Sequence, residues 1–271
     1  MSFLQVEQEK CICCGICSDV CPVKMIGMES QGPKAIGEHC IACGHCVAVC
    51  PTGALDNEKA PLANQLPLEK MPVLDADTAA RFLRSRRSIR NYKETQVPRE
   101  KIRQLLDIAR LAPTGSNSQG ISYYVFDRAE TLRKVVAAVI QWMEEEVKKA
   151  SAWAPYFTGI IDSYHKNGYD GILRGAPCLV VAATPKDFFL RGRDNTHFSL
   201  AYAELYAPSI GLGSCWAGFF EICATNYPPL MDVLGLPEDM AVTGALMVGY
   251  PKYTYKRLVD RNPLQVTWQE N

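Results

Sequence analysis

Nine of the twelve cysteines in this 271-residue chain lie within its first fifty residues. Eight of them form two runs of the pattern C-x-x-C-x-x-C-x-x-x-C-P, which are Cys11, Cys14, Cys17, Cys21-Pro22 and Cys40, Cys43, Cys46, Cys50-Pro51. Three thiolates at this spacing bind one iron–sulfur cube, and the fourth binds the other cube of a two-cube domain. The pattern therefore predicts two [4Fe–4S] clusters, one on Cys11, Cys14, Cys17 and Cys50 and the other on Cys40, Cys43, Cys46 and Cys21.

Structural zinc and disulfides are the alternatives for these cysteines. Zinc sites usually pair two well-separated C-x-x-C motifs, and disulfides suit secreted chains, whereas no signal peptide is visible here. Gly15 and Gly44 follow the second cysteine of each run, where the backbone must turn tightly. Cys13 lies outside the pattern and is given no role. Residues 3–57 resemble a bacterial two-cluster ferredoxin.

The chain divides into three parts by composition. We expect a ferredoxin-like domain over 1–58, a proline-containing linker over 59–74 and a larger domain over 75–271. The chain has 29 Lys and Arg residues and 29 Asp and Glu residues. It therefore carries no net positive charge that would attract nucleic acid or anionic lipid. No apolar run is long enough to span a bilayer. Oxygen-sensitive clusters in a chain of this kind lead us to expect a cytoplasmic protein.

The larger domain mixes helices and strands without strict alternation, which predicts an α+β fold. Asp75 or Asp77 is expected to cap a helix over 77–86, and Pro98 to begin a helix that Pro113 stops. Further helices are expected over 130–149, 196–210 and 231–234. Pro208 should kink or end the second of these, which is apolar enough to be buried in the core or between subunits. Strands are expected over 122–126, 178–183 and 242–249.

Four stretches of this domain suit a cofactor with a phosphate and a flat ring. Arginines in the segment 86–92 offer donors to a phosphate, although a solvated basic turn has the same composition. The polar loop 112–119 suits a planar heterocycle, and the glycines of 211–216 allow close approach of the backbone to a ring. Gly249-Tyr250-Pro251 precedes a second basic group. Each stretch alone could be an ordinary turn, cap or strand end.

Together, the order and spacing of these stretches resemble the FMN-dependent nitroreductase family over about 75–268, and R-R-S-x-R-x-Y is the most specific piece. The resemblance implies a central antiparallel sheet flanked by helices, in an intertwined homodimer with FMN bound between subunits. It assigns the FMN phosphate and ribityl to Arg86, Arg87, Ser88 and Arg90, with Arg261, or alternatively Arg257, completing the phosphate site. It assigns one side of the flavin ring to Pro113, Ser116, Asn117 and Gln119, and the other to Leu212, Gly213 and Ser214.

The resemblance implies no catalytic side chain, because flavin and water supply the protons in this family. His165 and His197 are therefore expected to be structural. The aromatic residues of the variable region 141–175 either stack on an acceptor or belong to a helical core: Trp142, Trp153, Tyr156, Phe157 and Tyr164.

Iron–sulfur clusters beside FMN predict an oxidoreductase in which the clusters and FMN exchange electrons and FMN reduces a small organic acceptor. The acceptor would be a nitroaromatic, a quinone or an activated alkene. The external low-potential donor would be a ferredoxin or NAD(P)H. An electron-transfer relay or redox sensor without its own substrate is an alternative function. Another flavin chemistry, such as reductive dehalogenation or cleavage of the flavin, is a third.

Overall fold

The computed structural model describes residues 2–68 and 71–269. The chain forms two compact units. The first runs to Val73 and includes Gly115–Ser118, and the second comprises Leu74–Thr114 and the residues from Gln119 onward. Within the described ranges, none of the helices combines the length and apolar character that crossing a membrane requires.

The first unit consists of two short antiparallel ribbons and two one-turn helices. Strand β1 (Leu4–Val6) pairs with β4 (Leu55–Asn57), and β2 (Ile26–Glu29) pairs with β3 (Gly32–Ala35). Helices α1 (Ile16–Asp19) and α2 (His45–Ala48) follow the glycines of the two cysteine runs, and a 3-10 turn, η1, spans Leu62–Asn64. The small core includes Cys17, Cys21 and Cys46 beside a few apolar side chains, so cysteines take positions that aliphatic residues would fill in a larger domain.

The backbone repeats every 29 residues in this unit, as the cysteine spacing does. Gly15 and Gly44 both have left-handed conformations, with φ of 80° and 71°. Cys13 and Ala42 form a second such pair, with φ of 50° and 56°, and Lys24 and Gly53 a third, with φ of 52° and 63°. The tight turns expected at the two glycines are therefore present. Cys13 corresponds in the repeat to an alanine.

The dipeptide Gly32-Pro33 favours a turn between the two cysteine runs, but the structure places the turn elsewhere. Both residues belong to β3, where Pro33 lies opposite Met28, and the turn is formed by Ser30 and Gln31. Pro33 is tolerated because a two-stranded ribbon leaves one side of each strand unpaired, so the missing N–H costs no ladder hydrogen bond.

In the described part of the second unit, four strands form one antiparallel sheet in the order β5–β6–β8–β7. They span Ser122–Phe126 (β5), Cys178–Pro185 (β6), Gly213–Trp216 (β7) and Met240–Gly249 (β8). Along β6, Val180 and Ala182 face one core while Leu179 and Val181 face the other. Both faces are covered, which explains why β6 and β8 read as continuous apolar runs.

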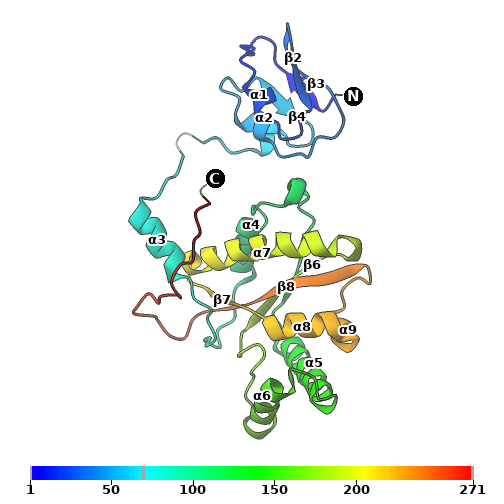
Figure 1. Ribbon diagram of the computed structural model, residues 1–271, viewed down its shortest axis with the longest axis vertical. Helices are drawn as coiled ribbons and strands as arrows, with labels where there is room; N and C mark the ends of the chain where they lie inside the picture. The colour runs from blue at the N-terminus through cyan, green and yellow to red at the C-terminus, as the bar shows by residue number, and fades with distance from the viewer. Residues whose placement is uncertain (1, 69–70, 270–271) are drawn as a thin grey trace. The chain divides into compact units, whose positions relative to one another are not determined.

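Helices cover both faces of this sheet (Figure 1). Helices α4 (Arg99–Ala109) and α7 (Phe189–Tyr206) pack on one face. Helices α5 (Ala129–Lys148), α6 (Ala154–Asn167), α8 (Gly218–Asn226) and α9 (Pro228–Leu234) build the core on the other. This arrangement confirms the expected α+β class with an antiparallel sheet flanked by helices.

Three helices begin within one residue of the expected start, although α4 ends at Ala109 rather than at Pro113. Asp75 caps α3 (Ala76–Ser85) by accepting a hydrogen bond from Thr78 N at 2.9 Å. Pro98 is the N-cap of α4 rather than its first residue, and α5 begins one residue earlier than expected. Helices α6 and α8 were not predicted from the sequence, and α9 begins at Pro228 rather than Met231.

Helix α7 begins at Phe189, well before the expected start at Thr196. Its first turns carry Gly192, whose added Cβ would collide with the Thr184 side chain of β6. The start of α7 therefore packs through a glycine against a threonine. Hydrophobic periodicity does not detect such a contact, so the sequence placed the start of the helix too late. Pro208 does end the α-helix, because the chain continues from Ala207 to Ile210 as the 3-10 turn η4. A further 3-10 turn, η3 (Lys186–Phe188), precedes α7.

Candidate functional site

The eight motif cysteines surround two cavities in the first unit. One cavity is lined by Cys11, Cys14, Cys17 and Cys50, and Cys13 also borders it. The other is lined by Cys21, Cys40, Cys43 and Cys46. In each cavity three cysteines come from one run and the fourth from the other, which is the exchange that the spacing predicts. Across the described ranges, no three His, Cys, Asp or Glu side chains converge as ligands of a single metal ion would. Four thiols spread around a cavity fit a cube with one thiolate on each iron.

Backbone N–H groups point at the fourth cysteine of each run. Met25 N donates to Cys21 Sγ at 3.3 Å, and Ala54 N donates to Cys50 Sγ at 3.3 Å. Burial tends to raise the pKa of Cys50, but hydrogen bonds from Ala54 and Thr52 outweigh it and lower that pKa. Lowered pKa favours the thiolate, which is the form that binds iron.

One side chain also donates to the thiols. Asn57 Nδ2 lies 3.8 Å from Cys40 Sγ and 3.7 Å from Cys46 Sγ. The pKa of Cys46 is raised by burial, against which the Asn57 hydrogen bond acts. Sequence reasoning did not single out Asn57, because its position two residues before the proline-containing linker carries no recognisable motif.

Three of the four stretches predicted to bind one cofactor meet in the second unit. Ser88 forms a parallel bridge with Ser214, and Ile89 N donates to Ser214 O at 2.9 Å. Tyr92 forms an antiparallel bridge with Pro251. The segment 86–92 is thereby held along the end of β7 and beside the turn after β8.

Close packing requires a glycine at position 213 in this junction. A Cβ added to Gly213 would lie 2.5 Å from Ile89 Cγ1 and 2.9 Å from Pro251 Cγ. Leu212, Gly213 and Ser214 are all buried. The glycine therefore lets the three stretches come together, and the predicted approach of a flat ring at this place stays a prediction.

Arg86 and Arg87 are half-buried at this junction, and Arg90 is exposed. Arg86 Nη1 lies 3.5 Å from Glu204 Oε1 on α7, and burial raises the pKa of Glu204 while Arg86 acts to lower it. Arg87 Nε is buried without a hydrogen-bond partner. The Arg87 guanidinium lies over the ring of Tyr255, with Cζ 5.4 Å from the ring centroid. A buried guanidinium nitrogen without an acceptor fits an anion such as a phosphate at this place.

The loop with the other predicted ring-binding residues has an unusual backbone. Ser116, Asn117 and Gln119 have φ of 53°, 52° and 55°, in the left-handed region that favours glycine. Such conformations cost free energy and often mark functional sites. Asn117 belongs to the first unit, where its Nδ2 donates to Ile41 O at 2.9 Å and Ala42 O at 3.0 Å. Pro113 is exposed.

Arg257 and Arg261 lie on the exposed segment that follows Pro251. Arg261 N donates to the Asp260 carboxylate in the same segment. Tyr255 is the residue of this segment that contacts Arg87, and sequence reasoning did not predict it.

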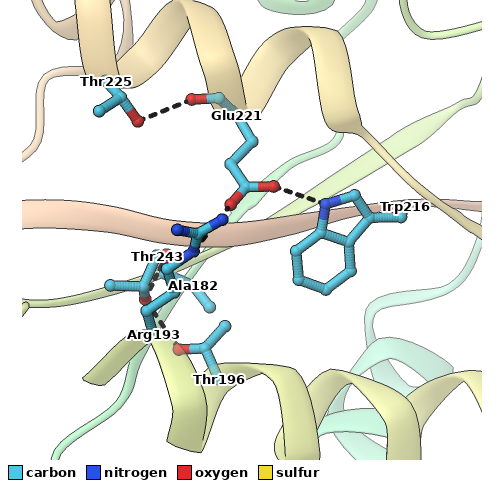
Figure 2. Close-up of polar contacts among 7 residues, drawn as sticks. All are labelled: Ala182, Arg193, Thr196, Trp216, Glu221, Thr225 and Thr243. Atoms are coloured by element: carbon cyan, nitrogen blue, oxygen red, sulfur yellow. Dashed lines mark hydrogen bonds and ion pairs between the residues drawn. The ribbon is translucent and has the colours of Figure 1, made fainter. Parts of the chain in front are cut away.

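A polar network fixes the far end of β7 to α7 and α8. Figure 2 shows Glu221 between Trp216 and Arg193. Trp216 Nε1 donates to Glu221 Oε2 at 2.6 Å, and Arg193 Nε lies 3.8 Å from Glu221 Oε1. Thr196 and Thr243 share a hydrogen bond of 2.7 Å beneath α7, and Thr243 Oγ1 also donates to Ala182 O (Figure 2). This network orients the strand whose first residues meet the segment 86–92.

The histidines and aromatic residues named from the sequence occupy packing positions. The His197 ring packs 5.0 Å from Trp216, and His165 Nε2 lies 2.6 Å from Glu144 at the surface. Trp142 and Phe157 are buried, with ring centroids 5.2 Å apart. Trp153 and Tyr156 are 49% and 62% exposed and pack against Phe157 and Phe219, respectively. Tyr164 packs at the edge of the same core.

Two family models match the chain. The one described as "Nitroreductase family" matches residues 83–250, and the one described as "4Fe-4S dicluster domain" matches residues 3–51. The first includes the segment 86–92 and the junction at Ser214, and the second includes all eight motif cysteines.

Individual proteins are similar to the larger part of the chain. A 4-nitrobenzoate reductase from Nocardioides sp. is 42% identical over 216 residues, covering 68% of this chain and 84% of that protein. An NADH dehydrogenase from Thermus thermophilus is 27% identical over 197 residues, covering 67% and 89%. The crystal structure of a nitroreductase with bound FMN from Bacteroides fragilis superimposes with a TM-score of 0.57 at 18% identity, covering 69% of this chain and 97% of that one. The last likeness shows a shared fold.

Proposed function

The chain belongs to the nitroreductase family and carries an N-terminal 4Fe–4S dicluster domain, and we propose that it reduces a small organic acceptor at FMN, which exchanges electrons with two [4Fe–4S] clusters. The observation that carries the proposal is the pair of cavities in the first unit. Each is lined by four motif cysteines, three from one run and one from the other. When bound, the clusters pass single electrons, and FMN takes electrons singly or in pairs and gives a hydride.

The proposed FMN site is built around the junction of segment 86–92 with β7. Arg87, whose buried Nε has no acceptor, would bind the phosphate, together with Arg86 and with Arg261 or Arg257. Arg86 would contact both the phosphate and the Glu204 carboxylate, with which it forms an ion pair. Ser88 and Arg90 would bind phosphate or ribityl oxygens. The flavin ring would lie against Pro113, Ser116, Asn117 and Gln119 on one side and Leu212, Gly213 and Ser214 on the other.

The acceptor that we favour is a nitroaromatic, because a relative 42% identical to this chain is named for the reduction of 4-nitrobenzoate. Quinones and activated alkenes are the other acceptors to be tested. The donor is a reduced ferredoxin or NAD(P)H. We assign no catalytic acid, and we place the protein in a reducing compartment such as the cytoplasm, because cluster ligands must remain thiolates.

We propose that the protein forms a homodimer through exposed surfaces of the second unit. Strand β5 is at one edge of the sheet, and the segment after Pro251 is exposed throughout its described residues. Leu264 and Trp268 on that segment are 87% and 85% exposed. Apolar side chains presented in this way favour burial against a second copy.

The proposal is tested with anaerobically purified holoprotein and 4-nitrobenzoate as acceptor. Reduced ferredoxin and NADH are supplied separately as donors. The Cys43→Ala variant should lose turnover driven by reduced ferredoxin, while dithionite still reduces the FMN that remains bound. Equal loss of ferredoxin-driven turnover and of FMN reduction by dithionite would contradict electron transfer through this cluster. Reduction of FMN without consumption of nitroaromatic, quinone or alkene would contradict the reductase function and favour a relay.

A further inference from the structure

We propose that Asn57 raises the reduction potential of the cluster held by Cys21, Cys40, Cys43 and Cys46, and so makes the two clusters inequivalent. The inference rests on the proposed function, since it requires both clusters. It concerns a residue outside the two cysteine motifs.

The internal repeat identifies the position to which Asn57 should be compared. Met28 and Asn57 are 29 residues apart, as are the cysteines of the two runs. Met28 is the third residue of β2, and Asn57 is the third residue of β4. Met28 lines the cavity of Cys11, Cys14, Cys17 and Cys50, and Asn57 lines the other cavity. The two side chains therefore occupy equivalent places beside the two clusters.

Their chemistry differs. Asn57 Nδ2 donates to Cys46 Sγ at 3.7 Å and Cys40 Sγ at 3.8 Å. The orientation of the amide is determined, because Asn57 Oδ1 accepts a hydrogen bond from Lys59 N at 2.9 Å. Asn57 is only 1% exposed, so water does not compete for its N–H groups. Met28 offers a thioether without any N–H donor.

Donors to the ligating sulfurs stabilise the reduced cluster, which carries one more negative charge, and therefore raise its potential. One backbone donor is the same in the two halves of the repeat, since Met25 N and Ala54 N each donate at 3.3 Å to a fourth cysteine. These two hydrogen bonds therefore do not contribute to a difference in reduction potential between the two clusters.

Among the described residues, one side-chain contact at the other cluster has no counterpart in the repeat. The Thr52 hydroxyl lies 3.8 Å from Cys50 Sγ, and the equivalent residue of the first run is Val23. It is a single contact in an exposed place, whereas Asn57 contacts two thiols in a buried one. Thr52→Val is therefore a matched control that should affect the other cluster, and by less.

The experiment is an anaerobic redox titration of the full-length holoprotein, with the reduced clusters followed by electron paramagnetic resonance. In Asn57→Met, one cluster should become harder to reduce by about tenfold or more in equilibrium constant, a shift of about 59 mV for one electron. The other cluster should not move. The reciprocal Met28→Asn should raise the potential of the other cluster. A shift of neither cluster, or of both equally, in Asn57→Met overturns the proposal.

A structural role through Lys59 makes a different prediction. Asn57→Asp keeps the acceptor for Lys59 N but lacks the amide donor and adds a negative charge, and we expect both changes to lower the potential. An unchanged potential in Asn57→Asp would show that Asn57 only anchors the turn, and would overturn the proposal. Iron analysis separates this failure from that of the proposed function. About eight iron atoms per chain with an unmoved potential contradicts only the role of Asn57, whereas about four contradicts the two-cluster function as well.

Discussion

The guanidinium of Arg87 lies over the ring of Tyr255, with Cζ 5.4 Å from the ring centroid, and its Nε is buried without an acceptor. Stacking on the ring holds the guanidinium in one orientation, and the unpartnered nitrogen leaves a donor for an incoming anion. The pair joins the opening of the second unit to its exposed C-terminal segment.

Replacing Arg87 should weaken the binding of FMN through its phosphate. We expect Arg87→Ala to reduce FMN affinity at least about tenfold, or about 1.4 kcal/mol, and to leave riboflavin affinity nearly unchanged, because riboflavin lacks the phosphate. Fluorescence titration of the flavin-free protein measures both. Arg84→Ala, an exposed residue at the end of α3, is the control and should change neither. Equal losses for FMN and riboflavin would argue against a phosphate contact.

Cys13 should be dispensable for the clusters. Its counterpart in the repeat is Ala42, so the second cysteine run has no thiol at this position. Cys13→Ala should retain about eight iron atoms per chain, whereas Cys14→Ala should lose about half of them or disrupt the domain. Iron and sulfide analysis after anaerobic purification measures this. Loss of iron in Cys13→Ala comparable to that in Cys14→Ala would show that Cys13 is a ligand.

Gly213→Ala should destabilise the junction of segment 86–92 with β7. The new Cβ would lie 2.5 Å from Ile89 and 2.9 Å from Pro251, and overpacking of this kind costs about 1–3 kcal/mol. Denaturant unfolding of the second unit, followed by tryptophan fluorescence, measures the loss. Gly218→Ala is the control, since its Cβ would meet only Trp216 Cδ1 at 3.8 Å. Equal stability of the two variants would mean that the junction relaxes around a methyl group.

Glu204 should make the stability of the second unit depend on pH. Burial raises the pKa of Glu204 in the folded chain. Its contribution to the free energy of unfolding is therefore fully present below the ordinary pKa near 4.5, and it is lost as the pH rises through the folded-state pKa. We therefore expect Glu204→Gln to flatten the fall in unfolding free energy above that range. Parallel denaturant titrations of both proteins at increasing pH would show it. Identical slopes would mean that Arg86 compensates the buried charge fully.

The exposed C-terminal segment should be needed for dimer formation. Replacing Leu264 and Trp268 by serine should raise the dimer dissociation constant at least about tenfold, because their exposed apolar surface would no longer be buried between copies. Analytical ultracentrifugation measures the constant. Leu66→Ser changes a residue that is 93% exposed in the first unit and should have no effect. An unchanged dimer, or a monomeric native protein, would contradict the proposed interface.

The sequence by itself determined the features that depend on local spacing. When three cysteines spaced three residues apart bind one cluster, the backbone must turn around that cluster. The same chemistry predicts that the fourth cysteine of each run binds the other cluster. Continuous apolar runs such as 178–183 could only be buried strands of a covered sheet. An aspartate cap, Asp75 or Asp77, predicted the start of α3 because a capping carboxylate acts over three residues, and the structure identifies Asp75 as the cap.

Only the tertiary structure decided the features that depend on residues far apart in the chain. The bridge between Ser88 and Ser214, the stacking of Tyr255 on Arg87 and the hydrogen bonds of Asn57 to Cys40 and Cys46 join segments that no local pattern connects. Gly213 illustrates the difference, since its small size is required by Ile89 and Pro251 rather than by its neighbours in sequence. Such residues are selected by close packing between side chains that are neighbours in space. The order of residues along the chain does not state which side chains will become neighbours.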